Sequence, residues 1–465
     1  MRHRRWAAIF RLPHLLAVLL LFSIVGGVLG QSMLTPSPGF QGAPSIPQLG
    51  VPSSTAAQMN AQIDNEINGE ANAATASQPT TRESDVEEAA AGAIVAPVQN
   101  LMEWGALHLH AELSHQFLYD SEIHTRPGES TATTTYTISA PIAAQIGPHV
   151  TLNYTPSYRI FSERGFRNTL DHYASLSAGV GYGDWSFGLS QAFSRTDEPL
   201  IETSSQTSQD NYNTGLSAVY HATDKISLEV SCSVDLTFVS GSESNVFIGG
   251  GTNTPGILTD SQDYSGSQWI NYQMNEKLAV GVGFTFGYTE QQNGLQSADE
   301  QYQGRFTWRP GKKVTVAIVG GVEDRQFLNS DAPDNLTPIF TTTASYEITG
   351  HTSLSLQASR SVNASLFEQQ ITESTQLGIG LQQRLLGLMQ LSMGFSYSSS
   401  DFKTARNQLA VVRTDDTESC VIGLSLPFFK RGNVGAFYSY NVNSSSQPGF
   451  GYSSSEVGAT LSWAY

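Results

Sequence analysis

The chain has 465 residues, of which 39% are hydrophobic, 14% are charged and 42 are glycine, and its formal net charge is −17. Such acidity argues against nucleic acid as a partner. After the first thirty residues no stretch approaches the ~20 consecutive apolar residues that a membrane-spanning helix needs. The composition resembles neither a helical membrane protein nor a typical soluble enzyme. It fits a transmembrane β-barrel, in which only one face of each strand must be apolar.

Residues 1–30 have the pattern of a secretory signal. An apolar run from Leu15 to Val28 ends at Val28-Leu29-Gly30, which is acceptable for cleavage. Four arginines precede the run: Arg2, Arg4, Arg5 and Arg11. Cleavage would remove these four positive charges and no acid, taking the net charge from −17 to −21. A retained membrane anchor is the alternative. A lipoprotein anchor is not expected, because no cysteine follows the run.

Residues 31–100 are rich in Pro, Ser, Ala, Gln and Asn and show no regular hydrophobic period. Acids outnumber the single base, Arg82. Because such a segment buries too little apolar surface to offset its ordering entropy, we predict a disordered periplasmic linker. Short helices over Ala56–Ala71 and Asp85–Val98, and a specific binding role, are alternatives.

The segment from Ile226 to Phe238 has the clearest pattern in residues 101–465. Its even positions are all apolar and its odd positions are all polar. Successive side chains of a strand point to opposite faces, so the segment has one apolar and one wet face. Thirteen residues at roughly 3.3 Å each span about 40 Å. Tilted by about 40°, they cross the ~30 Å core of a bilayer.

Similar segments follow one another from Glu103 to the last residue, and we predict eighteen strands, with sixteen as the alternative. The expected strands are Glu103–Tyr119, Ala132–Ile146, His149–Phe161, Leu170–Tyr182, Trp185–Arg195, Asn211–His221, Ile226–Val239, Asp263–Gln273, Leu278–Glu290, Glu300–Arg309, Val314–Arg325, Pro338–Ile348, Thr352–Val362, Thr372–Arg384, Leu388–Ser400, Thr417–Phe428, Asn433–Asn443 and Ser455–Tyr465.

Short and long connections alternate along the chain. Tight turns with Gly, Pro, Asn or Asp, such as Gly147-Pro148 and Gly183-Asp184, lie between each even-numbered strand and the next odd one. The other connections are generally longer: Ser194–Asp210, Ser240–Gln262, Leu328–Thr337 and Asp401–Asp416 are examples. This alternation is typical of outer-membrane barrels, and an even count puts both chain ends on the periplasmic side.

Aromatic residues gather near both ends of the predicted strands, as the girdles of a membrane barrel do. Tyr182, Trp308 and Phe428 lie near tight turns, while Phe238 and Tyr440 lie near long loops. The two cysteines, Cys232 and Cys420, fall on the apolar stripes of strands far apart in the order. We therefore expect no disulfide.

The last strand has the pattern expected of an assembly signal. Gly458-x-x-Leu461-x-Trp463, with Tyr465 as the final residue, resembles the C-terminal signal by which outer-membrane proteins are recognised for assembly.

Residues 101–465 resemble the outer-membrane β-barrel porin families of Gram-negative bacteria. The resemblance rests on three stretches: Trp104-Gly105-Ala106-Leu107-His108-Leu109, Asn153-Tyr154-Thr155-Pro156-Ser157-Tyr158 and Asn168-Thr169-Leu170-Asp171-His172-Tyr173. It implies the fold and a channel function but no particular cargo.

Catalytic motifs are missing from the sequence: it has no nucleophile elbow, Cys-x-x-Cys, His-Glu-x-x-His or phosphate-binding glycine loop. His108, His110 and Glu112 share one face of the first strand and are best explained as lumen-facing polar residues, with a metal site as the alternative. Asp171-His172 next to a surface loop leaves a hydrolytic pair as a weaker hypothesis. We predict no enzyme, no cofactor and no metal.

Strand parity places a set of charged side chains toward the lumen as pore-lining candidates, with five arginines against four acids. They are Arg159, Arg305, Arg309, Arg325 and Arg384, with Glu229, Asp235, Glu323 and Glu347. They could tune ion selectivity or brace the wall as salt bridges.

The sequence therefore predicts an all-β protein: a transmembrane antiparallel up-and-down barrel (101–465) behind a signal peptide (1–30) and a linker (31–100). The favoured function is a passive channel for small hydrophilic solutes. Its expected partners are outer-membrane lipid and the barrel assembly machinery. A structural or adhesive surface protein anchored by the barrel, and a barrel hydrolase, are the alternatives. The sequence leaves the solute and the oligomeric state open.

Overall fold

The structure is a computed structural model that describes residues 102–126, 129–200, 205–241, 258–292, 294–367, 369–405, 409–429 and 431–465. The predicted signal and linker lie outside the described residues. Among the described residues there is no helix long and apolar enough to cross a membrane.

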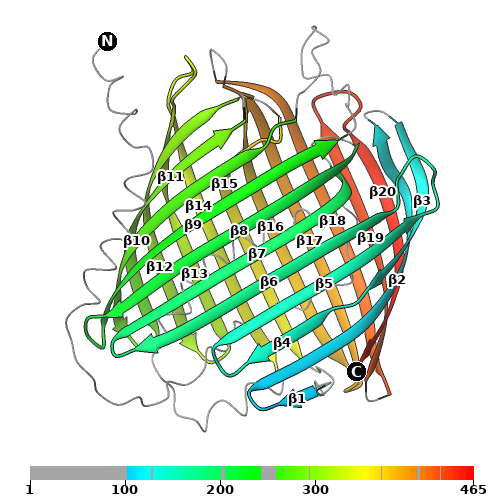
Figure 1. Cartoon of the computed structure of the whole chain (residues 1–465), viewed down its shortest axis with the longest axis horizontal. Coiled ribbons are helices and arrows are strands. Elements are labelled where there is room, and N and C mark those ends of the chain that lie inside the picture. The colour runs from blue at the N-terminus through cyan, green and yellow to red at the C-terminus, as the bar shows by residue number, and fades with distance from the viewer. Residues whose placement is uncertain are drawn as a thin grey trace. The chain divides into compact units, whose positions relative to one another are not determined.

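All the regular elements among the described residues are strands (Figure 1). In chain order they are β1 (Met102–Trp104), β2 (Leu107–Arg126), β3 (Glu129–Ser139), β4 (Ile142–Ile146), β5 (Val150–Phe161), β6 (Thr169–Tyr182), β7 (Trp185–Leu200), β8 (Ser205–His221), β9 (Ile226–Gly241), β10 (Ser261–Asn275), β11 (Leu278–Gln291), β12 (Gln296–Gly311), β13 (Val314–Phe327), β14 (Asn335–Thr349), β15 (Thr352–Ala364), β16 (Gln370–Leu385), β17 (Met389–Thr404), β18 (Ala410–Phe428), β19 (Gly432–Ser445) and β20 (Tyr452–Ala464).

These strands form one closed antiparallel barrel. Each pairs with its neighbours in sequence, and β20 pairs with β2 to close the wall. β3 and β4 are two halves of one wall strand, since both pair with β2 and β5. The interruption falls at Pro141, whose missing N–H cannot join the ladder. With β3 and β4 counted together and the short β1 set aside, the wall has eighteen strands, which confirms the predicted number.

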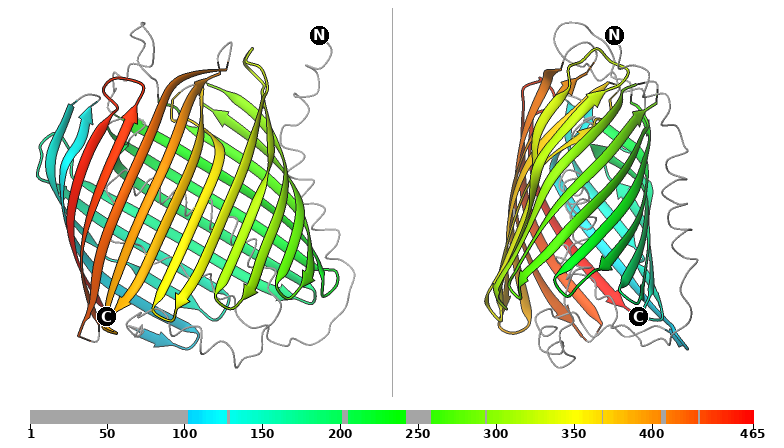
Figure 2. Two further views of the ribbon diagram at one scale, coloured as in Figure 1. Left: turned by 180° about the vertical axis from the view of Figure 1, so that it is seen from behind. Right: turned by 90° about the vertical axis from the view of Figure 1, so that its left-hand side faces the viewer.

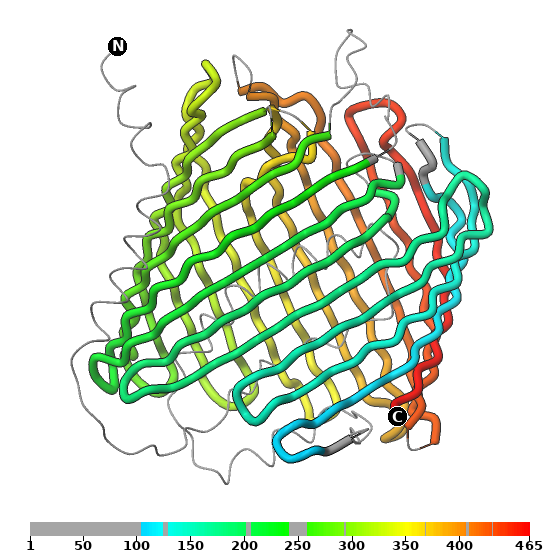
Figure 3. Tube along the Cα trace, viewed as in Figure 1, coloured from blue at the N-terminus to red at the C-terminus, as the bar shows by residue number. Residues whose placement is uncertain are grey.

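The predicted tight turns lie together at one end of the barrel, where β1 and the C-terminus also lie (Figures 1 and 3). Tyr182 pairs with Trp185 across Gly183-Asp184, and Gly183 takes a φ of +57°, which glycine adopts without steric cost. Leu386 and Gly387 both have positive φ, as hairpin turns of the mirror-image type require. Figure 2 shows the tilt of the strands from two further sides.

β9 shows how the two faces of the wall differ. Val230 is 42% exposed on the outside, whereas Glu229 is 1% exposed on the inside. The outward residues of the other strands form a continuous apolar band that includes Leu152, Ile270 and Val282. Both cysteines, Cys232 on β9 and Cys420 on β18, are exposed and free.

The predicted loops Ser194–Asp210 and Asp401–Asp416 were wrong in extent. β7 continues to Leu200 opposite Ser205, and β18 begins at Ala410 opposite Thr404. These strand ends are polar on both faces, so hydrophobic alternation disappears while the backbone ladder continues. For this reason, the strands predicted from hydrophobic alternation are too short at the loop end.

Candidate pore wall and constriction

The inner face of the wall is built mainly from small polar residues. Serine hydroxyls on neighbouring strands bond in pairs: Ser231 to Ser267 at 2.7 Å, and Ser233 to Ser265 at 2.8 Å. Residues of this size leave space inside a barrel of eighteen strands rather than filling it. Charged side chains stand out from this background in separate groups.

Arg159 is at the centre of a group near the loop end. Its guanidinium lies 2.6 Å from Glu198 and 3.1 Å from Asp171, which reach it from β7 and β6. Asp171 is fully buried and also accepts a hydrogen bond from the backbone N–H of Asp197. Arg159 is therefore compensated by two acids.

A second group lies nearer the tight-turn end, around Arg305 on β12. Arg305 bonds to Glu229 of β9 at 3.0 Å, although β10 and β11 lie between the two strands. Three steps of about 4.8 Å along the wall can be bridged by side chains only on the concave, inner face. The guanidinium also stacks over the ring of Trp269 at 4.1 Å. The other face of that ring covers Gly283, where a Cβ would lie 2.4 Å from a ring atom.

The other predicted pore-lining residues occupy two kinds of position. Asp235 accepts a hydrogen bond from Asn213, and Glu323 pairs with Arg325 at 2.8 Å in a buried contact. Arg309 and Arg384 are partly exposed and Glu347 is exposed, all close to the tight-turn end. The structure therefore brings the candidates into several groups along the inner wall and not into one ring.

Several inner-wall charges were missed by the sequence analysis as pore-lining residues. They are Asp120, Asp171, Glu198, Asp263, Asp299, Arg413, Asp415 and Glu456. Asp171, Asp263 and Glu456 lie within predicted strands, where parity already points inward. The other five lie just beyond predicted strand ends, and extending the strand parity through those ends would have found them. With them included, acids outnumber arginines on the inner face.

The wall splits between β14 and β15 at the loop end. Pairing of these strands stops at Phe340 and Arg360, although β14 runs on to Asn335 and β15 to Ala364. β15 remains paired with β16 up to Ala364, and β16 with β17 up to Gln370 and Thr404, so the β15–β16 hairpin separates from β14 while it stays joined to β17.

The tip of this β15–β16 hairpin meets loops from distant parts of the barrel. Phe367 forms an isolated β-bridge with Leu258, which precedes β10, and packs against Phe450 before β20. Gln291, at the end of β11, donates from its side chain to the Ser365 carbonyl at 2.8 Å. Contacts with loops on other sides of the closed wall place the tip over the lumen.

The space between the hairpin and the neighbouring wall is filled by an apolar cluster. Its buried members are Leu295, Phe327, Ala332, Val362, Ile371 and Ala405. Leu295, Ile371 and Ala405 are at most 2% exposed. The loop end of this side of the barrel is thus a small packed core.

The proposed hydrolytic pair does not form. Adjacent residues of a strand point to opposite faces, so Asp171 points inward to Arg159 while His172 points outward. There His172 Nδ1 lies 2.9 Å from the Tyr154 hydroxyl. No group of three or more His, Cys, Asp or Glu that could hold a metal ion occurs among the residues that the structure describes.

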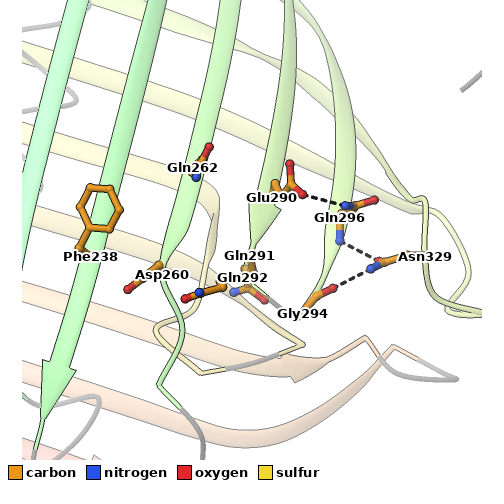
Figure 4. A pocket seen from close by; sticks show the side chains of 9 residues that line it. All are labelled: Phe238, Asp260, Gln262, Glu290, Gln291, Gln292, Gly294, Gln296 and Asn329. Carbon is orange, nitrogen blue, oxygen red and sulfur yellow. Dashed lines mark hydrogen bonds between the residues drawn. The ribbon is translucent and has the colours of Figure 1, made fainter. Parts of the chain in front are cut away.

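A polar groove of about 540 Å³ lies at the loop end of β9 to β12 (Figure 4). Gln262 and Glu290 face each other across β10 and β11, and Glu290 accepts a hydrogen bond from Gln296 at 3.0 Å. By strand parity with Val230, these residues point outward. The groove is therefore part of the outer rim and not of the lumen.

The predicted assembly residues lie along the closing seam. Trp463 pairs with Leu113 and Leu461 with His115 on β2, while the Tyr465 N–H donates to the Ala111 carbonyl at 2.9 Å. Gly458 lies beneath the inward ring of Phe437, which a Cβ would meet at 2.2 Å.

No protein-family model matches the chain, and no curated protein matches it. Similar solved structures include a BenF-like porin from Pseudomonas fluorescens Pf-5, at 8% identity and a TM-score of 0.42 over 77% of this chain and 99% of that one. Acinetobacter baumannii OccAB4 gives 10% identity and a TM-score of 0.40 over 79% and 99%. A mutant of the ferric enterobactin receptor PfeA from Pseudomonas aeruginosa gives 9% and 0.40 over 77% and 80%. No residue role is carried over from these proteins.

Proposed function

We propose that this protein is an outer-membrane, porin-like channel through which small hydrophilic solutes diffuse passively. One observation carries the proposal: a closed wall of eighteen strands has a continuous apolar band outside and a polar inner face of small residues. A barrel of this size is too wide for its side chains to fill, and barrels of about 16–18 strands enclose aqueous channels. The channel needs no cofactor and performs no covalent chemistry.

The inner face supports a preference for cations. Compensated groups such as Arg159 with Asp171 and Glu198 carry more negative than positive charge. The field inside a pore follows the fixed charge near its narrowest point, so excess acids attract cations and repel anions.

Conductance of the purified protein in planar bilayers tests the channel. We expect discrete, salt-dependent steps without any added ligand. Pore-forming detergent or contaminating porins are controlled by a matched preparation from cells that lack the gene. A folded, heat-modifiable barrel that never conducts would contradict the proposal and would leave the surface-anchor alternative.

The proposed orientation puts the tight turns and both chain ends in the periplasm and the long loops outside. Lipid would contact the apolar band, and the assembly machinery would recognise Gly458, Leu461, Trp463 and Tyr465. Single cysteines in Asn275-Glu276 and in Gly249-Gly250 test this orientation in intact cells, with Cys232 and Cys420 replaced by alanine. An impermeant thiol reagent should label only the second site. Labelling of the first site alone would reverse the orientation.

A further inference from the structure

Arg325 was predicted to line the pore, but its surroundings give it a different role. The side chain is 4% exposed and lies between two acids, with Nε donating to Glu323 at 2.8 Å and a terminal nitrogen 3.6 Å from Asp299. A buried arginine compensated by two carboxylates presents little positive field to an ion in the lumen.

The same guanidinium reaches the base of the β15–β16 hairpin. Its Nη2 donates to the carbonyl of Val362 at 3.0 Å. Val362 lies beyond Arg360, the last residue of β15 that pairs with β14. Arg325 on β13 therefore holds the hairpin at the point where it separates from β14.

A second contact bridges the split further along. Glu373 of β16 accepts hydrogen bonds from Asn335 of β14 at 3.0 Å and from Lys403 of β17 at 2.5 Å. Arg360 donates to the other carboxylate oxygen at 3.0 Å. The hairpin is thus fixed at its base by Arg325 and Glu373, and at its tip by the contact of Phe367 with Leu258.

We propose that Arg325 is a positioning residue that sets the width of the pore by holding the β15–β16 hairpin over the lumen, and that it does not set ion selectivity. This inference rests on the proposed channel function. It assigns the size limit for passing solutes to the β15–β16 hairpin. The hairpin remains seated while solutes pass, because its contacts are buried at base and tip.

The variant Arg325→Met tests the proposal in a background with Cys232→Ala and Cys420→Ala. Without Arg325, the end of β15 should be released from β13 and the split between β14 and β15 should widen, so we expect a severalfold rise in single-channel conductance and passage of larger uncharged polyethylene glycols. Because Arg325→Met leaves Asp299 and Glu323 uncompensated, the reversal potential across a KCl gradient is measured in the charge-balanced variant Glu323→Gln with Arg325→Met, where it should not change. The matched control Arg309→Met removes a partly exposed inner arginine away from the hairpin, and should shift the reversal potential toward cations without changing the polymer limit.

An engineered disulfide at the tip of the hairpin should reverse the effect of Arg325→Met. Leu258 and Phe367 are antiparallel bridge partners, and such pairs lie within the ~4.4–6.8 Å between Cα atoms that a disulfide spans. In Arg325→Met, the pair Leu258→Cys and Phe367→Cys should restore the smaller conductance when oxidised and lose it again on reduction. Unchanged conductance in Arg325→Met, or a shifted reversal potential at unchanged width, would overturn the proposal.

Loss of Arg325 leaves two buried acids without a partner, which costs stability. Should Arg325→Met fail to fold, the triple variant Asp299→Asn, Glu323→Gln and Arg325→Met removes all three charges and gives the same test. The yield of the Leu258–Phe367 disulfide with Arg325 intact and replaced reports hairpin seating without any conductance measurement. A seated hairpin in a protein that does not conduct would contradict the channel function, whereas equal yields in both would contradict the role of Arg325.

Discussion

The two ends of the barrel are organised in different ways. At the tight-turn end, strands are joined by local signals, as where Tyr182 pairs with Trp185 across a two-residue turn. At the loop end, the β15–β16 hairpin is held by partners far away in the sequence: Gln291 and Ser365 are 74 residues apart. Substitutions at the tight-turn end should therefore affect barrel assembly and local backbone strain. Substitutions at the loop end should instead change the width of the pore.

The strongest effect should come from the terminal aromatic at the tight-turn end. Tyr465→Asp places a charge at the membrane interface, on the residue that bonds to Ala111 across the closing seam. We expect a large loss of inserted barrel, measured as heat-modifiable protein in outer-membrane fractions. The matched control Tyr182→Asp changes an exposed aromatic at the same end but away from the seam, and should assemble better. Equal yields of the two variants would show that the terminal residue has no special role.

A smaller effect is expected midway along β9, where Arg should destabilise the barrel more on the outer face than on the inner face. Arg at Val230, on the lipid side, should cost about 2–4 kcal/mol, whereas Arg at Ser231, facing the lumen, should be tolerated. The free energy of unfolding from urea titrations in a reversible folding system measures both. Equal losses would mean that the faces of β9 are assigned the wrong way round.

Two glycine substitutions compare the stability cost of a clash with a side chain from another strand with the cost of a strained turn. Gly283→Ala puts a Cβ 2.4 Å from Trp269, so the ring must move, at a cost of about 1–3 kcal/mol. Gly183→Ala meets nothing within 4 Å and bears only the strain of its positive φ, about 1–2 kcal/mol. We expect the larger loss in urea unfolding at Gly283, together with a change in tryptophan fluorescence. A larger loss at Gly183 would place the main constraint in the turn.

The smallest effect expected is the ion selectivity that the inner-wall charges produce. The excess of acids on the inner face should give a weak preference for cations, seen as the sign of the reversal potential across a KCl gradient. The preference should fade between 0.1 M and 1 M salt, because the screening length falls from about 10 Å to about 3 Å. Anion preference would mean that partly exposed arginines such as Arg309 and Arg384 dominate the narrow section.

The inner-wall charges show which pore-lining residues can be predicted from the sequence and which cannot. Strand parity was sufficient to name Glu229 and Arg305, because their strands alternate cleanly through the membrane. It missed Asp299 because this residue precedes the predicted start of its strand at Glu300, and only backbone pairing shows that the strand extends there. Glu456 lies within the predicted strand Ser455–Tyr465, where parity already points inward, and was overlooked. Parity also could not show that Arg325 is buried between Glu323 and Asp299, since Asp299 comes from a different strand.

The sequence by itself determined the barrel: strand number, the positions of the tight turns and the assignment of faces in the membrane span. These follow from local rules, since a strand that separates lipid from water must alternate and a two-residue turn needs particular residues. Only the tertiary structure decided that the wall splits between β14 and β15, and that the tip of the β15–β16 hairpin meets the loops before β10 and β20. That arrangement depends on buried contacts of Arg325, Glu373 and Phe367 with residues distant in the chain. No local pattern records such contacts, because each residue alone reads as an ordinary strand or loop residue.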